Sequence, residues 1–243
     1  MTNSKTSDPG RSGPVTDHIS SNGIAPDQAS PDSNRTDPDR NCARCDRLVA
    51  FREKHRGLEP SWFNAPVPTF CGRNVKLLIV GLAPGLRGAN RTGRPFTGDF
   101  AGDLLYETLI EFGLATGRYA ARSDDGLTLI KTAITNAVRC VPPENKPIGE
   151  EIRACRPFLE RTIAAYDDLK AIVLLGRIAH DTTLTTLGLK RSAHPFAHAA
   201  EHRIGNDLVL FDSYHCSRYN TNTRRLTPDM FKAVFRNVAR HIA

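Results

Sequence analysis

The feature that most constrains the fold of this chain is a set of short apolar runs separated by stretches with helical spacing. The runs at 75–80 and 169–175 consist largely of Val, Ile and Leu, and a glycine follows the first. Short continuous runs of this kind are typical of strands buried on both faces, as in a parallel sheet covered by helices. Further strand patterns cover 132–138 and 207–214. All of these runs are too short to span a bilayer.

Stretches with helical spacing lie between and around these strands. They cover 42–55, 99–112, 149–166 and 177–187, and a last helix begins at Thr227-Pro228, with threonine as the N-cap. The alternation predicts an α/β domain, a three-layer sandwich in which helices flank a central, four-stranded, mostly parallel sheet. Ligands of such sheets bind at the carboxyl ends of the strands, so we expect the functional residues in the loops that follow them.

Residues 1–40 differ in composition from the rest of the chain. Ser, Thr, Pro, Gly, Asp and Asn supply 28 of these 40 residues, and Phe, Tyr and Trp are absent from them. Such a segment buries too little apolar surface to offset the entropy that it would lose on ordering. We therefore predict a disordered N-terminal tail at 1–40 and one folded domain at 41–243.

The positive charge of the chain lies on the predicted domain. The chain has 33 Lys and Arg against 26 Asp and Glu, and the tail holds four basic and six acidic residues, which leaves +9 for 41–243. A basic domain suits a polyanionic partner such as nucleic acid, although many proteins without such a partner are equally basic. The sequence has neither a secretory signal nor a membrane span, so we expect a cytoplasmic protein with no membrane contact.

A long loop rich in glycine and proline follows the first strand and reaches Asp99, where the next helix begins. Glycines allow backbone N–H groups to approach a ligand closely, and the start of a helix offers its positive end. The loop matches neither the P-loop nor the dinucleotide-binding fingerprint. A plain surface loop with Asp99 as the helix N-cap is the alternative, but loops of this length in compact domains are usually functional.

Three segments, in chain order, resemble the motifs of uracil-DNA glycosylases of the family 5 type. They are the loop at 81–99, the segment 135–143, and the segment 213–223 with its His-x-Ser motif and Asn-Thr-Asn-Thr continuation. The resemblance covers roughly residues 41–243. It implies a monomeric DNA-repair glycosylase, associated with the nucleoid, that acts on uracil and other deaminated bases such as hypoxanthine in double-stranded DNA. Such an enzyme flips the base out and hydrolyses its N-glycosidic bond, which leaves an abasic site.

The resemblance implies three catalytic residues. His215 would donate to the base oxygen that gains negative charge, and Asn136 would present a donor and an acceptor to the Watson–Crick edge of uracil. Asp99 would orient water or stabilise the positive sugar, and this role is compatible with a helix N-cap. Phe96 would stack on the flipped base, with a core phenylalanine as the alternative.

Other residues of the same motifs are expected to contact the base or the DNA. Where several branches of the superfamily carry an acid or amide early in the first loop, this chain has Leu82-Ala83. This difference makes Asp99 the best candidate for the catalytic carboxylate. Either Arg218 or Tyr219 is expected to fill the space left by the flipped base. The remaining expected base contacts are Gly81, Ala83, Gly85, Asn90, Ser217 and Asn220.

Several arginines near the expected site are candidate phosphate contacts, with solvated surface charge as the alternative. Phosphate contacts of this kind would make DNA binding strongly dependent on salt. The candidates are Arg87, Arg91, Arg94, Arg139, Arg224 and Arg225.

Four of the six cysteines suggest a metal site. Cys42 and Cys45 form a Cys-x2-Cys pair, and 14 residues separate Cys140 from Cys155. Four thiolates hold either tetrahedral zinc or an iron–sulfur cluster, and the spacing alone does not choose between them. The resemblance implies a [4Fe–4S] cluster with a structural role on these four residues. The alternatives to a glycosylase are a non-catalytic iron–sulfur protein that binds damaged DNA, and an iron–sulfur electron carrier.

Overall fold

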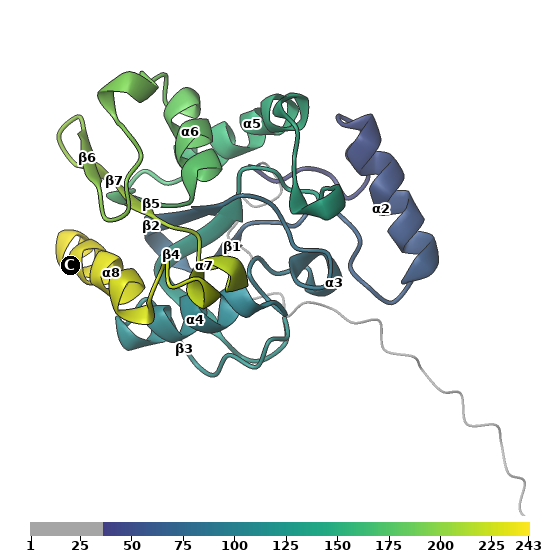
Figure 1. Cartoon of the computed structure of the whole chain (residues 1–243), viewed down its shortest axis with the longest axis horizontal. Coiled ribbons are helices and arrows are strands. Elements are labelled where there is room, and N and C mark those ends of the chain that lie inside the picture. The colour runs from purple at the N-terminus through teal and green to yellow at the C-terminus, as the bar shows by residue number, and fades with distance from the viewer. Residues whose placement is uncertain (1–35) are drawn as a thin grey trace, which may run out of the picture.

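A mixed sheet forms the centre of the structure, a computed structural model that describes residues 36–243 (Figure 1). Four parallel strands form the middle of this sheet, and they are the four that the apolar runs predict. Each is continuously buried toward its carboxyl end, as expected of strands covered on both faces. In spatial order they are β4 (Thr128–Asn136), β2 (Arg73–Gly81), β5 (Ala171–Leu175) and β7 (Leu208–Ser213).

Three short antiparallel strands extend the sheet beyond the predicted four. β1 (Phe70–Cys71) and β3 (Ala115–Thr116) pair with β4, and β6 (Glu201–Ile204) pairs with β7. The sheet therefore has seven strands. The additional strands escape prediction because they are two to four residues long and carry no continuous apolar run.

Helices cover both faces of the sheet, which confirms the predicted three layers (Figure 1). One face is covered by α5 (Gly149–Ala164) and α6 (Arg177–Thr186), and the other by α4 (Phe100–Glu111) and α8 (Pro228–Ile242). Each face of the sheet has its own hydrophobic core, and neighbouring residues of β5 belong to different cores. Ile172 packs beneath α5 and α6, and Val173 packs against α4 and α8. Within residues 36–243, no helix is both long and apolar enough to cross a membrane.

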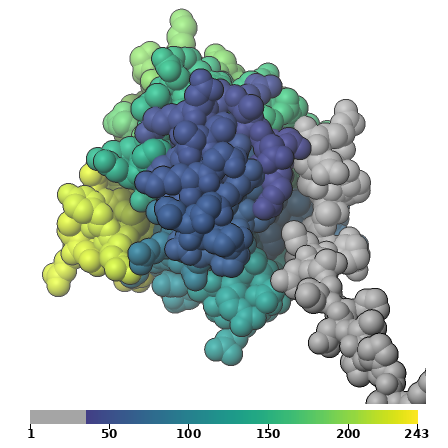
Figure 2. All heavy atoms as spheres, turned by 90° about the vertical axis from the view of Figure 1, so that its right-hand side faces the viewer, coloured from purple at the N-terminus to yellow at the C-terminus, as the bar shows by residue number. Residues whose placement is uncertain are grey.

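The remaining helices lie at one end of the sheet. The first predicted helix is α2 (Asp46–Leu58), which begins after its N-cap Cys45 rather than at residue 42. Two short helices that the sequence did not predict, α3 (Ala89–Thr92) and α7 (Arg218–Asn222), lie in the loops after β2 and β7. Figure 2 shows α2 and its flanking segments, coloured purple to blue, covering much of this end of the molecule. The 3-10 helices are η1 (Pro143–Asn145) and η2 (Arg191–Ala193).

The register of the parallel strands brings three loops to the same edge of the sheet. Gly81 lies opposite Asn136 at the ends of β2 and β4, and Ser213 lies opposite Leu175 at the ends of β7 and β5. The loops that follow Gly81, Asn136 and Ser213 therefore emerge close together, and Figure 1 shows α3 and α7 at this edge. These are the three loops that carry the motifs.

Residues 36–40, which their composition assigned to the tail, lie against the domain through a buried ion pair. Arg139 is fully buried, and its Nη1 donates to Asp37 Oδ1 at 2.6 Å and to Thr69 Oγ1 at 2.9 Å. Its Nη2 donates to Thr162 Oγ1 at 2.8 Å. A buried cation is tolerated when a carboxylate and hydroxyl groups surround it in this way. The rest of the predicted tail, 1–35, lies outside the described residues.

Removal of the Asp37 carboxylate is expected to destabilise the fold, because the charge of Arg139 would remain buried without its partner. For Asp37→Ala we expect the free energy of unfolding to fall by about 3 kcal/mol in chemical denaturation. Asp39→Ala is the control, since Asp39 is exposed and accepts from the nearby backbone N–H of Asn41. It should change stability by less than about 0.5 kcal/mol, and equal stability of the two variants would contradict the buried ion pair.

Candidate active site and cysteine pocket

Gly81 is the point at which two predicted site residues meet. It is the last residue of β2, and Asn136 lies opposite it at the end of β4. A side chain at Gly81 would place its Cβ 2.5 Å from Phe96 Cζ and would overlap Asn136 Oδ1. The absence of a side chain at Gly81 therefore allows Asn136 and Phe96 to approach the end of the strand.

Phe96 has a strained backbone that its neighbours hold in place. Its φ of 53° lies in the left-handed region, which a bulky residue rarely adopts. Its carbonyl accepts from the Tyr119 hydroxyl at 3.2 Å, and the hydroxyl of Tyr106 donates to the preceding carbonyl, that of Pro95, at 2.6 Å. Strain of this kind is concentrated at functional sites.

His215 reaches the same place from the loop after β7. Its ring stacks on that of Phe96, with centroids 5.8 Å apart and an interplanar angle of 28°. The Asn220 side chain donates to the His215 carbonyl at 2.8 Å, which fixes the backbone of the loop. Among the described residues no group bonds to the buried Nδ1 of His215. Burial lowers the pKa of His215 to about 4, so the imidazole is neutral at neutral pH.

Asp99 lies at the start of α4, where its Oδ1 accepts from the Gly102 N–H at 3.3 Å. The expected helix N-cap is therefore confirmed. The other oxygen, Oδ2, faces the glycines of the first loop. A Cβ at Gly88 would overlap it, and a Cβ at Gly85 would lie 3.1 Å away. Burial raises the pKa of Asp99, while backbone N–H groups, that of Gly102 first, oppose the shift.

Cys216 connects Asp99 with the loop of His215. The thiol is fully buried and lies 3.5 Å from the carbonyl oxygen of Ala101, in the first turn of α4. Burial raises its pKa, and the charge of Asp99 raises it further. The carboxylate therefore lies near the residue that follows His215, and the three predicted catalytic residues gather at one edge of the sheet.

Three residues expected to contact the base use their side chains within the protein. The buried Asn90 amide donates to Asn64 Oδ1 at 2.9 Å, and Ser217 caps α7 by accepting from the Asn220 N–H at 3.4 Å. Ala83 packs against the hydrophobic cluster beside the cysteines. These residues hold the motif loops in shape, as the Asn220 side chain does.

The structure also separates the arginines into two groups. Arg94 and Arg139 are buried in ion pairs, Arg94 with Asp125 through two contacts of 2.8 Å, and are not placed for phosphate contacts. The guanidinium of Arg218 lies over the Phe100 ring at 5.3 Å, whereas the Tyr219 side chain is 71% exposed. The remaining candidates are exposed, namely Arg87, Arg91, Arg224 and Arg225.

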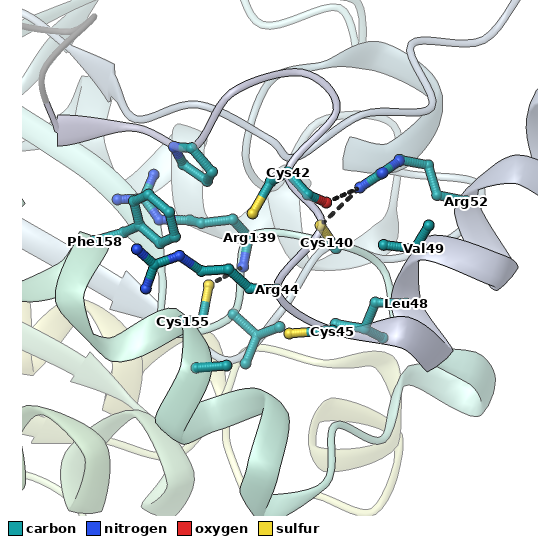
Figure 3. A pocket seen from close by; sticks show the side chains of 13 residues that line it. Cys42, Arg44, Cys45, Leu48, Val49, Arg52, Arg139, Cys140, Cys155 and Phe158 are labelled. Atoms are coloured by element: carbon teal, nitrogen blue, oxygen red, sulfur yellow. Dashed lines mark hydrogen bonds between the residues drawn. The ribbon is translucent and has the colours of Figure 1, made fainter.

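The four predicted cysteine ligands line one pocket (Figure 3). Cys42 and Cys45 precede α2, Cys140 lies in the loop after β4, and Cys155 lies on α5. Burial, followed by the charge of Cys155, raises the pKa of Cys45 to about 11 and that of Cys140 to about 12. These cysteines would be thiolates at neutral pH only with a bound cation. The apolar wall of the pocket includes Leu48, Val138 and Phe158.

Two N–H donors point at the sulfurs. The backbone N–H of Arg139 donates to Cys155 Sγ at 3.3 Å, and Arg52 Nη1 donates to Cys140 Sγ at 3.8 Å and to the Cys42 carbonyl (Figure 3). Arg52 is not among the residues predicted for this site. Its position could have indicated this role, because it follows Cys45 by about two helical turns and so faces the same side of α2.

A comparison with protein families agrees with this geometry. The sequence model of the uracil DNA glycosylase superfamily matches residues 68–239. The chain belongs to this superfamily. A type-5 uracil-DNA glycosylase of Thermus thermophilus is 45% identical over 205 residues, which cover 82% of this chain and 93% of the relative. Type-5 uracil-DNA glycosylases of Pyrobaculum aerophilum and Mycobacterium tuberculosis are 38% and 40% identical, over 82% and 80% of this chain and 88% and 76% of their own lengths. The family that the three motifs indicated is confirmed.

The buried, neutral His215 predicts a loss of stability in acid. The pKa of His215 falls from 6.5 in the unfolded chain to about 4 in the folded chain. Between pH 6.5 and about pH 4, the unfolded chain therefore binds a proton at His215 and the folded chain does not. The stability that depends on neutral His215 is complete above pH 6.5 and is lost as the pH falls toward 4, by up to about 3 kcal/mol.

Chemical denaturation of the wild type and of His215→Gln across this pH range tests the shift. The variant lacks the titrating group, so its free energy of unfolding should fall less than that of the wild type on acidification. Parallel pH profiles for the two proteins would contradict a buried neutral imidazole.

Proposed function

We propose that this chain is a DNA-repair glycosylase that hydrolyses the N-glycosidic bond of uracil in DNA and leaves an abasic site. The observation that carries the proposal is the direct contact of Phe96 with His215, and of both Asn136 and Phe96 with Gly81, at the carboxyl edge of the sheet. The names of the relatives, uracil-DNA glycosylases of type 5, support the same activity. We extend it to hypoxanthine and to bases flipped from double-stranded DNA.

Recognition of the flipped base would use one ring and one amide. The Phe96 ring offers a face on which a base stacks, and the Asn136 amide carries a donor and an acceptor that match one Watson–Crick edge. Asn136 is 3% exposed and ends a buried strand, so its orientation is fixed before the base arrives. Binding at this edge follows the rule for parallel sheets, in which ligands bind beyond the carboxyl ends of the strands.

Bond cleavage would depend on His215 and Asp99. As the bond to the sugar breaks, negative charge develops on the base and positive charge on the sugar. A neutral His215 can donate an N–H to the base oxygen, and its contact with the Phe96 ring supports a role for both residues at the same base. The Asp99 carboxylate would stabilise the sugar cation and orient the attacking water. Its partial burial strengthens this interaction, because opposite charges attract more strongly where water is excluded.

The exposed groups around the site suit DNA. Tyr219 is the better candidate for the residue that replaces the flipped base, because its side chain is exposed while Arg218 lies on Phe100. Exposed arginines on both sides of the site, Arg87 and Arg91 on the first loop and Arg224 and Arg225 after α7, would bind phosphates.

We also assign a [4Fe–4S] cluster to Cys42, Cys45, Cys140 and Cys155. Around tetrahedral zinc, sulfurs lie about 3.8 Å apart, because each Zn–S bond is about 2.3 Å long. Within residues 36–243, one group of three ligand atoms from His, Cys, Asp or Glu lies within 4.8 Å of one another, and it contains no cysteine. No three of the four cysteine sulfurs are therefore that close together. The wider spacing of the sulfurs favours a cluster over a single ion. The cluster would join the start of α2 to α5 and to the loop after β4.

The test of the activity is a base-release assay on duplex DNA with one uracil or one hypoxanthine, followed by alkaline cleavage at abasic sites. We expect strand breakage at the lesion with both duplexes and none with unmodified DNA. A single strand with one uracil tests the preference for duplex. Binding to damaged duplex without breakage would overturn the proposal in favour of a non-catalytic damage-binding protein.

Asp99→Asn separates catalysis from helix capping. Asparagine is as good an N-cap as aspartate, and it removes a charge that burial disfavours, so the free energy of unfolding should equal or exceed that of the wild type. The single-turnover rate of uracil release should fall by roughly 10²- to 10⁴-fold. A normal rate in this variant would remove Asp99 from the mechanism.

Cys140→Ser tests the cluster. We expect the wild-type chain to contain about four iron atoms and acid-labile sulfide, and the variant to lose most of both. Cys71→Ser is the matched control, since Cys71 lies on β1 and not in the pocket, and it should retain the iron. Stoichiometric zinc in place of iron, or unchanged iron in Cys140→Ser, would contradict the assignment.

A further inference from the structure

A second group of potential metal ligands lies behind the loop of His215, on the side of the sheet that α5 and α6 cover. Asp212 is fully buried near the end of β7, and two histidines converge on its carboxylate. His180 Nδ1, from α6, lies 2.7 Å from Oδ1, and His202 Nε2, from β6, lies 3.1 Å from Oδ2. One ligand atom from each of the three residues lies within 4.8 Å of the other two.

The hydrogen bonds of His180 require a proton or a metal cation between its ring and Asp212. Its Nε2 lies 2.9 Å from the His194 carbonyl oxygen, which only accepts, so Nε2 carries a proton. In the neutral ring, Nδ1 then presents a lone pair, and this lone pair faces a carboxylate oxygen. The contact at 2.7 Å is repulsive unless a second proton or a metal cation lies there.

The arrangement has the features of a metal site. Ligating histidines commonly donate their second N–H to a backbone carbonyl, as His180 does to His194. Two imidazole nitrogens and a carboxylate oxygen are ligands that zinc accepts, with a fourth position left to water or another side chain. The ring of His194 lies edge-on to that of His202, with centroids 5.4 Å apart, but His194 is not among the ligand atoms that lie within 4.8 Å of one another. The segment 191–200, whose His194 carbonyl contacts His180, is largely exposed.

We propose that His180, His202 and Asp212 bind a divalent transition-metal ion of the zinc type, with water in the fourth position. The ion would join α6, β6 and β7 across the segment 191–200, in which η2 is the one regular element that the structure describes. This segment supports the loop of His215. The His198 ring stacks on that of Tyr214 at 5.1 Å, and its Nδ1 accepts from the Tyr214 N–H at 3.2 Å.

Titration with Co²⁺ tests the site and separates it from the cysteine pocket. The full chain, treated with a chelator and with its iron content recorded, should bind one equivalent of Co²⁺. Imidazole and carboxylate ligands give visible absorption bands without the thiolate-to-metal charge-transfer band that cysteine ligands would add. Added Zn²⁺ should displace the Co²⁺ and should raise the melting temperature.

His202→Gln should lose this stoichiometric binding. His198→Gln is the matched control, because it lies on the segment 191–200 but contacts Tyr214, and it should bind as the wild type does. The site is overturned if His202→Gln binds Co²⁺ as tightly as the wild type, or if the bound Co²⁺ has thiolate ligands. It is also overturned if ¹⁵N NMR at saturating Zn²⁺ shows His180 protonated on both nitrogens, because the residues then form a buried imidazolium–carboxylate pair.

Discussion

The site depends on the close parallel pairing of β2 with β4 at a position that has no side chain. Gly81 lies opposite Asn136, and the Phe96 ring occupies the space that a side chain at Gly81 would fill. The stacking of His215 on that ring brings in the third loop. Because all three loops leave the same edge of the sheet, one steric requirement at Gly81 governs the approach of an amide and an aromatic ring, and the imidazole contacts that ring.

Several residues of the site contribute to the fold as well as to the proposed chemistry. Asp99 caps α4 while its second oxygen faces the glycine loop, and Asn220 fixes the backbone of His215. The burial that keeps His215 neutral also opposes the ionised form of Asp99. The local fold therefore holds a neutral donor and a partly buried carboxylate at the same edge of the sheet, where both are useful as charge develops.

Much of the fold could be predicted from the sequence, because strands buried on both faces give apolar runs and the helix at Thr227 has a clear N-cap. The short edge strands could not, since two to four half-exposed residues leave no periodic signal. The motifs predicted that Asn136, Phe96 and His215 come together, and the cysteine pattern predicted the residues of the cysteine pocket. The motifs could not show that Asn90 bonds to Asn64, because an asparagine in a motif looks the same whether it contacts a ligand or another side chain. Composition likewise hid Asp37, whose ion pair with Arg139 depends on tertiary structure.

The most direct test of this account is the single-turnover rate of uracil release by Gly81→Ala. The added methyl group would force Asn136 and Phe96 away from the end of β2, so the rate should fall by roughly a hundredfold or more while binding to abasic-site DNA is retained. Gly57→Ala is the control, since a Cβ at Gly57 meets nothing within 4 Å and its rate should be unchanged. A Gly81→Ala protein that is folded and releases uracil at the wild-type rate would contradict the account.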